Sequence, residues 1–190
     1  MRGKNIAPMN PSELKSLSKF LSLILRHEPE RIGLTLDDAG WAGIDTLLEN
    51  ATASGRPMTR AQLEAVVETS DKKRFAISED GLRIRANQGH SIDVDLGLLP
   101  VAPPAVLYHG TATRFLASIL AAGLDKRQRH HVHLTSDLAV ARSVGQRYGV
   151  VVLLTVDAAR MHADGHVFFR SENGVWLTDT VPAHYLCADA

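Results

Sequence analysis

The stretch Arg74-Phe75-Ala76-Ile77-Ser78-Glu79-Asp80-Gly81-Leu82-Arg83-Ile84-Arg85 decides how the first half of this 190-residue chain folds. Apolar and polar residues alternate on both sides of Glu79-Asp80-Gly81, and a glycine-containing turn between two alternating runs is typical of a β-hairpin. Helices are expected before it over residues 11–27 and 44–53 and from Thr59 onward. Three helices followed by a hairpin predict a winged helix, a fold that usually binds nucleic acid, although a fold alone establishes no function.

Capping residues place the boundaries of the first helix. Asn10 suits an N-cap and Pro11 the first helical position, and leucine and isoleucine residues follow at helical spacing. Because the residue before a proline disfavours helical angles, Pro29 is expected to end this helix near His27.

The third helix is expected to be acidic. It begins at Thr59, with Gln62 in the capping-box position. It carries Glu64 and Glu68, and its one basic residue is Arg60. Such a helix suits a phosphate-lined groove poorly, which weighs against a DNA-binding regulator with a ligand-sensing second half.

A proline-rich stretch separates two expected domains. Residues 97–104 contain three prolines and no charge, so we expect a linker there, between domains at 1–96 and 105–190. Beyond it the patterns predict strands over 105–109, 131–134, 150–156, 166–170 and 175–178, and helices over 113–122 and 137–148. Short strands with two helices predict an α+β lobe, so the expected class of the whole chain is α+β.

Composition excludes several classes of protein. Lys+Arg and Asp+Glu both number 21, so the chain cannot bind nucleic acid through a large overall positive charge, although a local basic site remains open. No apolar run is long enough for a membrane span, and no signal segment opens the chain. The single cysteine, Cys187, excludes a disulfide framework and a cysteine-rich zinc site. A cytoplasmic protein without membrane contact, acting as a monomer, is expected.

Three side chains of the first half suit anion binding. Arg26-His27 ends the first helix, where cations compensate the helix dipole by ~0.3–1 kcal/mol. Arg74 begins a hairpin strand and by alternation points away from the core. Arg26, His27 and Arg74 together could instead form an anion site, because guanidinium groups match phosphate oxygens.

Histidines dominate the polar positions of the second half. His131 and His133 share one face of an expected strand, but no third ligand follows at a suitable spacing, so no metal site is predicted. His109 lies before Gly110-Thr111. His109 is either a polar core residue or a group that orients a ligand. Gly110, which has no side chain, would let such a ligand come close to the backbone.

Several short segments occur in a specific order. In the first half they are residues 17–22 running into Leu25-Arg26-His27, Gly33-Leu34, Asp38-Ala39-Gly40-Trp41, Lys73-Arg74-Phe75 and residues 83–91. In the second half they are Leu107-Tyr108-His109-Gly110-Thr111, residues 129–134 and residues 173–178. Over about residues 14–186 this order resembles the RNA 2′-phosphotransferase family, the tRNA-splicing 2′-phosphotransferases.

The resemblance implies a fold and a reaction. It implies a winged-helix RNA-binding lobe followed by an ADP-ribosyltransferase-like lobe that binds NAD as co-substrate, without metal. The RNA 2′-phosphate would attack C1″ of the nicotinamide ribose, giving an RNA-2′-phospho-ADP-ribose intermediate. The ribose 2″-hydroxyl would then attack the phosphate, releasing 2′-OH RNA and ADP-ribose 1″,2″-cyclic phosphate. The alternative is an enzyme that ADP-ribosylates terminal phosphates of RNA or DNA and stops there.

The resemblance also implies site residues. The catalytic set would be Arg26, His27, Arg74 and Arg129. The NAD contacts would be His109, Gly110, Thr111, His133, Thr135, Asn173 and Val175. The implied partners are NAD and an RNA that carries a 2′-phosphate.

One position departs from the family pattern. Arg127 stands where the family commonly has an apolar residue, two places before its last catalytic arginine. Counting from His131-Val132-His133 favours Arg129 for the catalytic place, and Arg127 stays the alternative. If strand alternation reaches back that far, both arginines lie on the same side of an extended segment.

Overall fold

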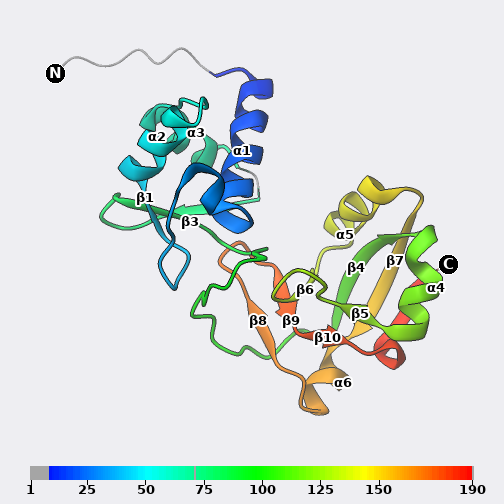
Figure 1. The fold of residues 1–190 in the computed structure, drawn as a ribbon. Coiled ribbons are helices and arrows are strands. Elements are labelled where there is room, and N and C mark those ends of the chain that lie inside the picture. The colour runs from blue at the N-terminus through cyan, green and yellow to red at the C-terminus, as the bar shows by residue number, and fades with distance from the viewer. Residues whose placement is uncertain (1–8, 71, 190) are drawn as a thin grey trace. The chain divides into compact units, whose positions relative to one another are not determined.

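The computed structural model describes residues 9–70 and 72–189. The chain divides into two compact units, residues 1–97 and 98–190, and each combines helices with strands (Figure 1). The predicted α+β class is therefore confirmed. No helix within the described ranges is long and apolar enough to cross a membrane.

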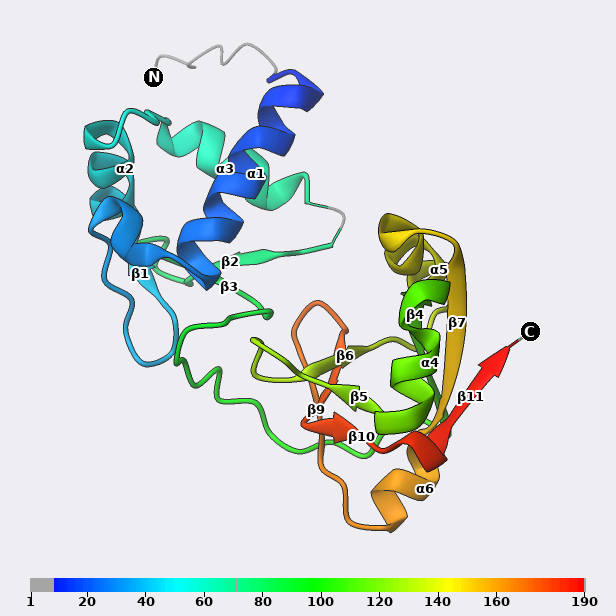
Figure 2. The same ribbon diagram turned by 45° about the vertical axis from the view of Figure 1, so that its right-hand side comes forward.

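The first unit packs three helices on a small antiparallel sheet. The helices are α1 (Pro11–Arg26), α2 (Ile44–Ala53) and α3 (Arg60–Glu68), with a 3-10 turn at Pro29–Ile32. The strands are β1 (Ala42–Gly43), β2 (Phe75–Ile77) and β3 (Arg83–Ala86), in the order β1-β3-β2. Figure 2 shows the helices over one face of this sheet. The predicted helices and hairpin are confirmed, whereas β1 was not anticipated.

Capping and burial account for these helices. Asn10 Oδ1 accepts the Glu13 N–H at 2.8 Å, and Thr59 and Gln62 form the expected capping box. The Glu13 carboxylate accepts the Gln62 side-chain amide at 3.0 Å, which ties the start of α1 to α3. The core beneath consists of fully buried aliphatic side chains: Leu21, Ile24, Leu25, Ile44, Leu47, Leu63 and Ile84.

The second unit contains three antiparallel sheets. One has the order β11-β7-β4, from β4 (Val106–Ala112), β7 (Val151–Asp157) and β11 (Leu186–Asp189). Another has the order β6-β9-β8, from β6 (Val132–Leu134), β8 (Phe168–Arg170) and β9 (Trp176–Thr178). The third pairs β5 (Leu124–Asp125) with β10 (Thr180–Val181). The helices are α4 (Thr113–Ala122), α5 (Leu138–Gly145) and α6 (Ala158–Ala163), with 3-10 turns at Gln146–Tyr148 and Ala183–Tyr185.

Several predicted boundaries in this unit differ from the observed ones, and the strand expected over 166–170 begins only at Phe168. The strand expected over 105–109 continues to Ala112, because β4 pairs residue by residue with β7 through Gly110 and Thr111. The helix expected over 137–148 leaves α-helical geometry after Gly145 and ends as a 3-10 turn. The strands β5, β10 and β11 and the helix α6 were not anticipated.

The proline-rich stretch is attached to the second unit. The Val101 N–H donates to the Phe168 carbonyl at 2.8 Å, and Pro100 forms a bridge with Phe169. These residues therefore extend the edge of the β6-β9-β8 sheet.

Gly110 is required by the packing of α5 against β4. A Cβ atom there would lie 1.7 Å from the carbonyl oxygen of Ala141 and 3.0 Å from the nitrogen of Gly145. Because both atoms belong to helix backbone, Gly110→Ala is expected to displace α5 and to lower the free energy of unfolding by about 3 kcal/mol or more. Gly43→Ala is the matched control, since its Cβ would meet the Thr46 side chain, with Oγ1 nearest at 3.4 Å, and should cost less than about 1 kcal/mol. Urea-induced unfolding of both variants measures the difference, and equal costs would contradict this account.

Candidate functional site

In the first unit, Arg26 and Arg74 are neighbours although 48 positions separate them. Arg26 Nη2 donates to the Arg74 carbonyl oxygen at 3.5 Å, and the Arg26 guanidinium lies 5.9 Å from the centre of the Phe75 ring. Arg74 itself is half-buried, with Nη1 3.4 Å from Ser70 Oγ at the end of α3. The last turn of α1 thus lies against the residue immediately before β2, so that the Arg26 guanidinium meets the backbone of Arg74.

His27 lies at the same end of α1 and is exposed. It is the C-cap residue of the helix, and its Nδ1 is 2.9 Å from the hydroxyl of Ser91. The Ser91 N–H donates to the Arg26 carbonyl oxygen at 2.9 Å. The structure therefore groups Arg26, His27 and Arg74, the three residues predicted from the first half. Basic side chains at a helix C-terminus can compensate the helix dipole or bind an anion, and this arrangement agrees with both interpretations.

In the second unit, hydrogen bonds link Arg129, His133 and His109. Arg129 Nη1 donates to His133 Nδ1 at 3.0 Å, and His109 Nδ1 is 3.1 Å from the His133 carbonyl oxygen. Because a guanidinium can only donate, His133 Nδ1 accepts and the ring proton is on Nε2. Because a carbonyl can only accept, His109 carries its proton on Nδ1. Both imidazoles are therefore held in defined, opposite tautomers.

The expectation that Arg127 and Arg129 share one side of an extended segment was wrong. Arg127 has φ of 54° in a turn where its N–H donates to Asp125 Oδ1 and the Arg129 N–H donates to the Lys126 carbonyl. A left-handed residue breaks strand alternation. Of the two arginines, Arg129 is the one bonded to the β6 histidine.

The other predicted NAD contacts lie on neighbouring strands and turns. Thr135 follows β6 and pairs with Tyr108 of β4, while its Oγ1 accepts the Asp137 N–H at 3.1 Å. Asn173 and Val175 lie in the β8–β9 turn, where both contact the buried hydroxyl of Ser171.

Gly110 and Thr111 are packed inside the second unit. Gly110 faces the backbone of α5, and the Thr111 side chain is 5% exposed. The backbone that approaches Gly110 closely is therefore that of α5 and not a ligand. The assignment of Gly110 and Thr111 to NAD binding stays a prediction.

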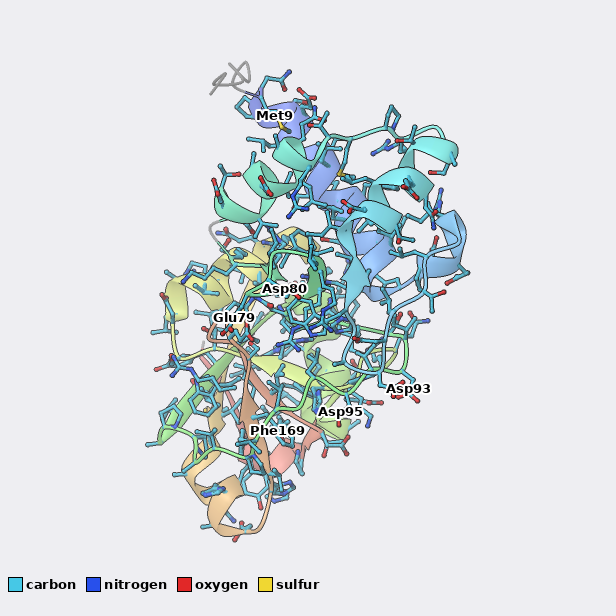
Figure 3. The ribbon with its side chains drawn as sticks, turned by 90° about the vertical axis from the view of Figure 1, so that its left-hand side faces the viewer. Met9, Glu79, Asp80, Asp93, Asp95 and Phe169 are labelled. Atoms are coloured by element: carbon cyan, nitrogen blue, oxygen red, sulfur yellow. The ribbon has the colours of Figure 1, made fainter. Side chains whose placement is uncertain are left out.

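His131 packs as part of the sheet. Its ring meets Phe169, labelled on β8 in Figure 3, edge-on at 5.4 Å. Burial lowers the pKa of His131, and the charges of His130 and Lys126 lower it further against the opposing effect of Asp179. Across residues 9–70 and 72–189, no three His, Cys, Asp or Glu side chains gather closely enough to hold a metal ion.

Sequence reasoning assigned no role to Asn87 or Ser91. The Asn87 N–H donates to the Arg74 carbonyl at 3.0 Å, and its side-chain amide donates to the Lys73 carbonyl at 2.7 Å. The segment that contains both residues contributes to the family resemblance only through its position in the order of segments. The polar run Asn87-Gln88-Gly89-His90-Ser91 directly after the strand was the available signal.

His109 should make stability depend on pH. Burial lowers its pKa below the usual 6.5 and the charge of Arg129 lowers it further, although the hydrogen bond to the His133 carbonyl raises it. The unfolded chain therefore takes up this proton first, and the stabilisation is present above about pH 6.5 and lost as pH falls through the folded-state pKa. The free energy of unfolding should fall more between pH 7 and pH 5 for the parent than for His109→Gln, at about 1.4 kcal/mol for each unit of pKa lowering. Urea titrations at both pH values measure it; identical losses would show that other groups carry the effect.

Comparison with known proteins finds similarity over most of the chain. A family model described as "RNA 2'-phosphotransferase, Tpt1 / KptA family" matches residues 12–180. A "Probable RNA 2'-phosphotransferase" of Agrobacterium fabrum is 59% identical over 173 residues, covering 91% of this chain and 93% of that protein. Proteins with the same name from Pseudomonas aeruginosa and Nostoc punctiforme are 56% and 50% identical, each over 94% of this chain and 98% of their own length.

Proposed function

The chain belongs to the RNA 2′-phosphotransferase family, and we propose that it removes an internal 2′-phosphate from RNA with NAD as co-substrate. The observation that carries the proposal is the grouping of Arg26, His27 and Arg74 at one end of α1. The RNA 2′-phosphate is dianionic, and arginines placed where charge develops stabilise a phosphoryl-transfer transition state.

The two units would divide the work. The first, with three helices followed by a hairpin, would be a winged-helix lobe that holds the RNA. The second would be an ADP-ribosyltransferase-like lobe that holds NAD. The donor set supports this second assignment: neutral His109 and His133 suit sugar hydroxyls, and the Arg129 cation suits a pyrophosphate or the transferred phosphate.

The first step requires positioning above all. NAD supplies a ribose C1″ whose bond to nicotinamide is weakened by the pyridinium charge. An oxygen of the RNA 2′-phosphate forms the new bond to C1″, and nicotinamide leaves as a neutral molecule with the bonding electron pair. No acid is needed to protonate such a leaving group, so the first step depends on holding the two anionic substrates in place. Arg26 and Arg74 would bind the RNA phosphate in the first unit, and Arg129 would bind an anionic group in the second.

The second step requires a hydroxyl to be activated. Phosphorus in the RNA-2′-phospho-ADP-ribose intermediate accepts the ribose 2″-oxygen, and its bond to the RNA 2′-oxygen breaks. The proton lost from the 2″-hydroxyl ends on the RNA 2′-oxygen, and ADP-ribose 1″,2″-cyclic phosphate is released. His27 is the group proposed to take that proton or to orient the hydroxyl, because it is exposed and lies beside Arg26.

One incubation tests the reaction. A 2′-phosphorylated oligonucleotide is incubated with and without NAD, in the presence and absence of a chelator, and every product is identified by mass. Nicotinamide, 2′-OH RNA and ADP-ribose 1″,2″-cyclic phosphate are expected whenever NAD is present. ADP-ribose that stays on the RNA would instead identify a terminal or internal ADP-ribosyltransferase, and loss of activity restored only by zinc would contradict a metal-free reaction.

A further inference from the structure

The segment Asn87–Ser91, which follows β3, contacts each of the three residues proposed for catalysis in the first unit, Arg74 through its backbone. Asn87 bonds the backbone at Arg74, Gly89 lies against the Arg26 side chain, and Ser91 bonds His27. We propose that this segment is a positioning loop that holds Arg26, His27 and Arg74 in their working arrangement. The inference rests on the proposed function, and its residues act through the catalytic groups rather than on the substrate.

Asn87 holds the backbone from which Arg74 projects. Asn87 is 6% exposed. Its side-chain amide donates to the Lys73 carbonyl at 2.7 Å, and its backbone N–H donates to the Arg74 carbonyl at 3.0 Å. Lys73 has φ of 39°, a left-handed conformation that is costly for any residue with a Cβ atom. Since the Asn87 amide bonds the carbonyl of this strained residue, Asn87 keeps Lys73 in that conformation and thereby sets the direction of Arg74.

Gly89 makes room for Arg26. Its φ is 88°, and a Cβ atom there would lie 3.5 Å from Arg26 Nη1. The left-handed conformation turns the loop over the guanidinium, and it favours glycine at this position. The chain then returns to α1, where the Ser91 N–H donates to the Arg26 carbonyl oxygen at 2.9 Å.

Ser91 orients His27. Its hydroxyl is 2.9 Å from His27 Nδ1 and, because a hydroxyl both donates and accepts, it can fix either ring tautomer. A base that takes a proton at Nε2 must carry its own proton on Nδ1, so the hydroxyl of Ser91 would accept that proton in the working state. The backbone bond from Ser91 to Arg26 does not involve the hydroxyl, so Ser91→Ala removes the His27 contact alone.

The test of Ser91 has a readout besides activity. In the free protein, ¹⁵N NMR of the His27 ring should report one dominant tautomer in the parent and in Ser91→Thr, and a mixture in Ser91→Ala. Turnover at saturating substrates should fall about 10-fold or more in Ser91→Ala, with KM for RNA within about twofold, and recover in Ser91→Thr. An unchanged tautomer in Ser91→Ala would overturn the role of Ser91, whether or not the protein turns over RNA.

The test of Asn87 uses a second substitution as rescue. Asn87→Ala should lower turnover about 10-fold, because Lys73 can then relax and redirect Arg74. Adding Lys73→Gly should restore turnover to within about threefold of the Lys73→Gly single variant, since glycine adopts positive φ without a restraint. If Asn87 instead contacts RNA, Lys73→Gly rescues nothing, and that result would overturn the proposal.

Asn50→Ala is the matched control for Asn87. Asn50 also donates its side-chain amide to a backbone carbonyl, that of Gly33 at 2.9 Å, and it lies in α2 of the same unit. It should lower the midpoint of thermal unfolding about as much as Asn87→Ala and leave turnover unchanged. Equal loss of turnover in both variants would show a general effect of instability and not a positioning loop. If the parent protein forms no NAD-dependent products, the proposed function itself is contradicted. The NMR measurement on His27 still tests the role of Ser91 in that case, because it needs no substrate.

Discussion

Arg129→Ala is expected to lower turnover at saturating NAD and RNA by about 10³-fold or more, the effect typical of an arginine that stabilises phosphoryl-transfer charge. Two observations favour this residue. The family resemblance implies the catalytic arginine at this spacing from the β6 histidine. The Arg129 guanidinium also donates to His133 Nδ1 at 3.0 Å, which fixes the direction of the side chain. A fixed guanidinium loses little conformational freedom when it meets a phosphate.

Arg127→Ala should behave differently. Both arginines are exposed, but Arg127 has a positive φ and its backbone N–H bonds Asp125 Oδ1, whereas the Arg129 side chain bonds His133. Its loss should weaken RNA binding by a factor that shrinks as salt rises, because solvated charges are screened. Steady-state kinetics of both variants at low and high salt decide between them. The opposite ranking would show that Arg127 occupies the catalytic place and that the alignment of this segment is wrong.

His27→Ala and Arg74→Ala are expected to let the RNA-2′-phospho-ADP-ribose intermediate accumulate. In the proposed reaction the first step expels a neutral leaving group and depends on positioning, whereas the second must activate a ribose hydroxyl and stabilise a new charge at phosphorus. Loss of a general base or a charge-stabilising group typically costs about 10²- to 10⁴-fold, so the second step should become rate-limiting. A single-turnover time course with end-labelled RNA should show the heavier intermediate rising before product.

The neighbouring Lys72 provides the control for Arg74. Lys72 is exposed, and Lys72→Ala should form product without accumulation of intermediate. If neither His27→Ala nor Arg74→Ala accumulates intermediate, and both fail to bind 2′-phosphorylated RNA in a titration, the two residues hold the RNA and do not take part in the second step.

Several elements could be predicted because their signals are local. The N-cap bond of Asn10 joins residues three positions apart, and so does the capping box of Thr59 and Gln62. The hairpin turn at Glu79 and Asp80, labelled in Figure 3, is closed by bonds from Ser78 and Leu82 to the Asp80 carboxylate. Each of these interactions depends on a few consecutive residues, so residue type and spacing are sufficient to predict it.

Strands of two residues could not be predicted in this way. Ala42 and Gly43 form β1 only because Ile84 and Arg83 lie opposite them, and Leu124–Asp125 forms β5 only through Thr180 and Val181. Two residues have no periodicity to recognise, and their pairing is decided by which backbone groups the rest of the unit leaves beside them.

The same division applies to the candidate site. The sequence by itself determined the residue types, the order of the segments and hence the family, since identity along the chain needs no coordinates. Only the tertiary structure decided that Arg26 bonds the carbonyl of Arg74, 48 positions away, that His27 meets Ser91, 64 positions away, and that α5 lies against Gly110. These contacts join segments far apart in the chain, and they form because burial of the helix and sheet faces brings those segments together, which local spacing does not encode.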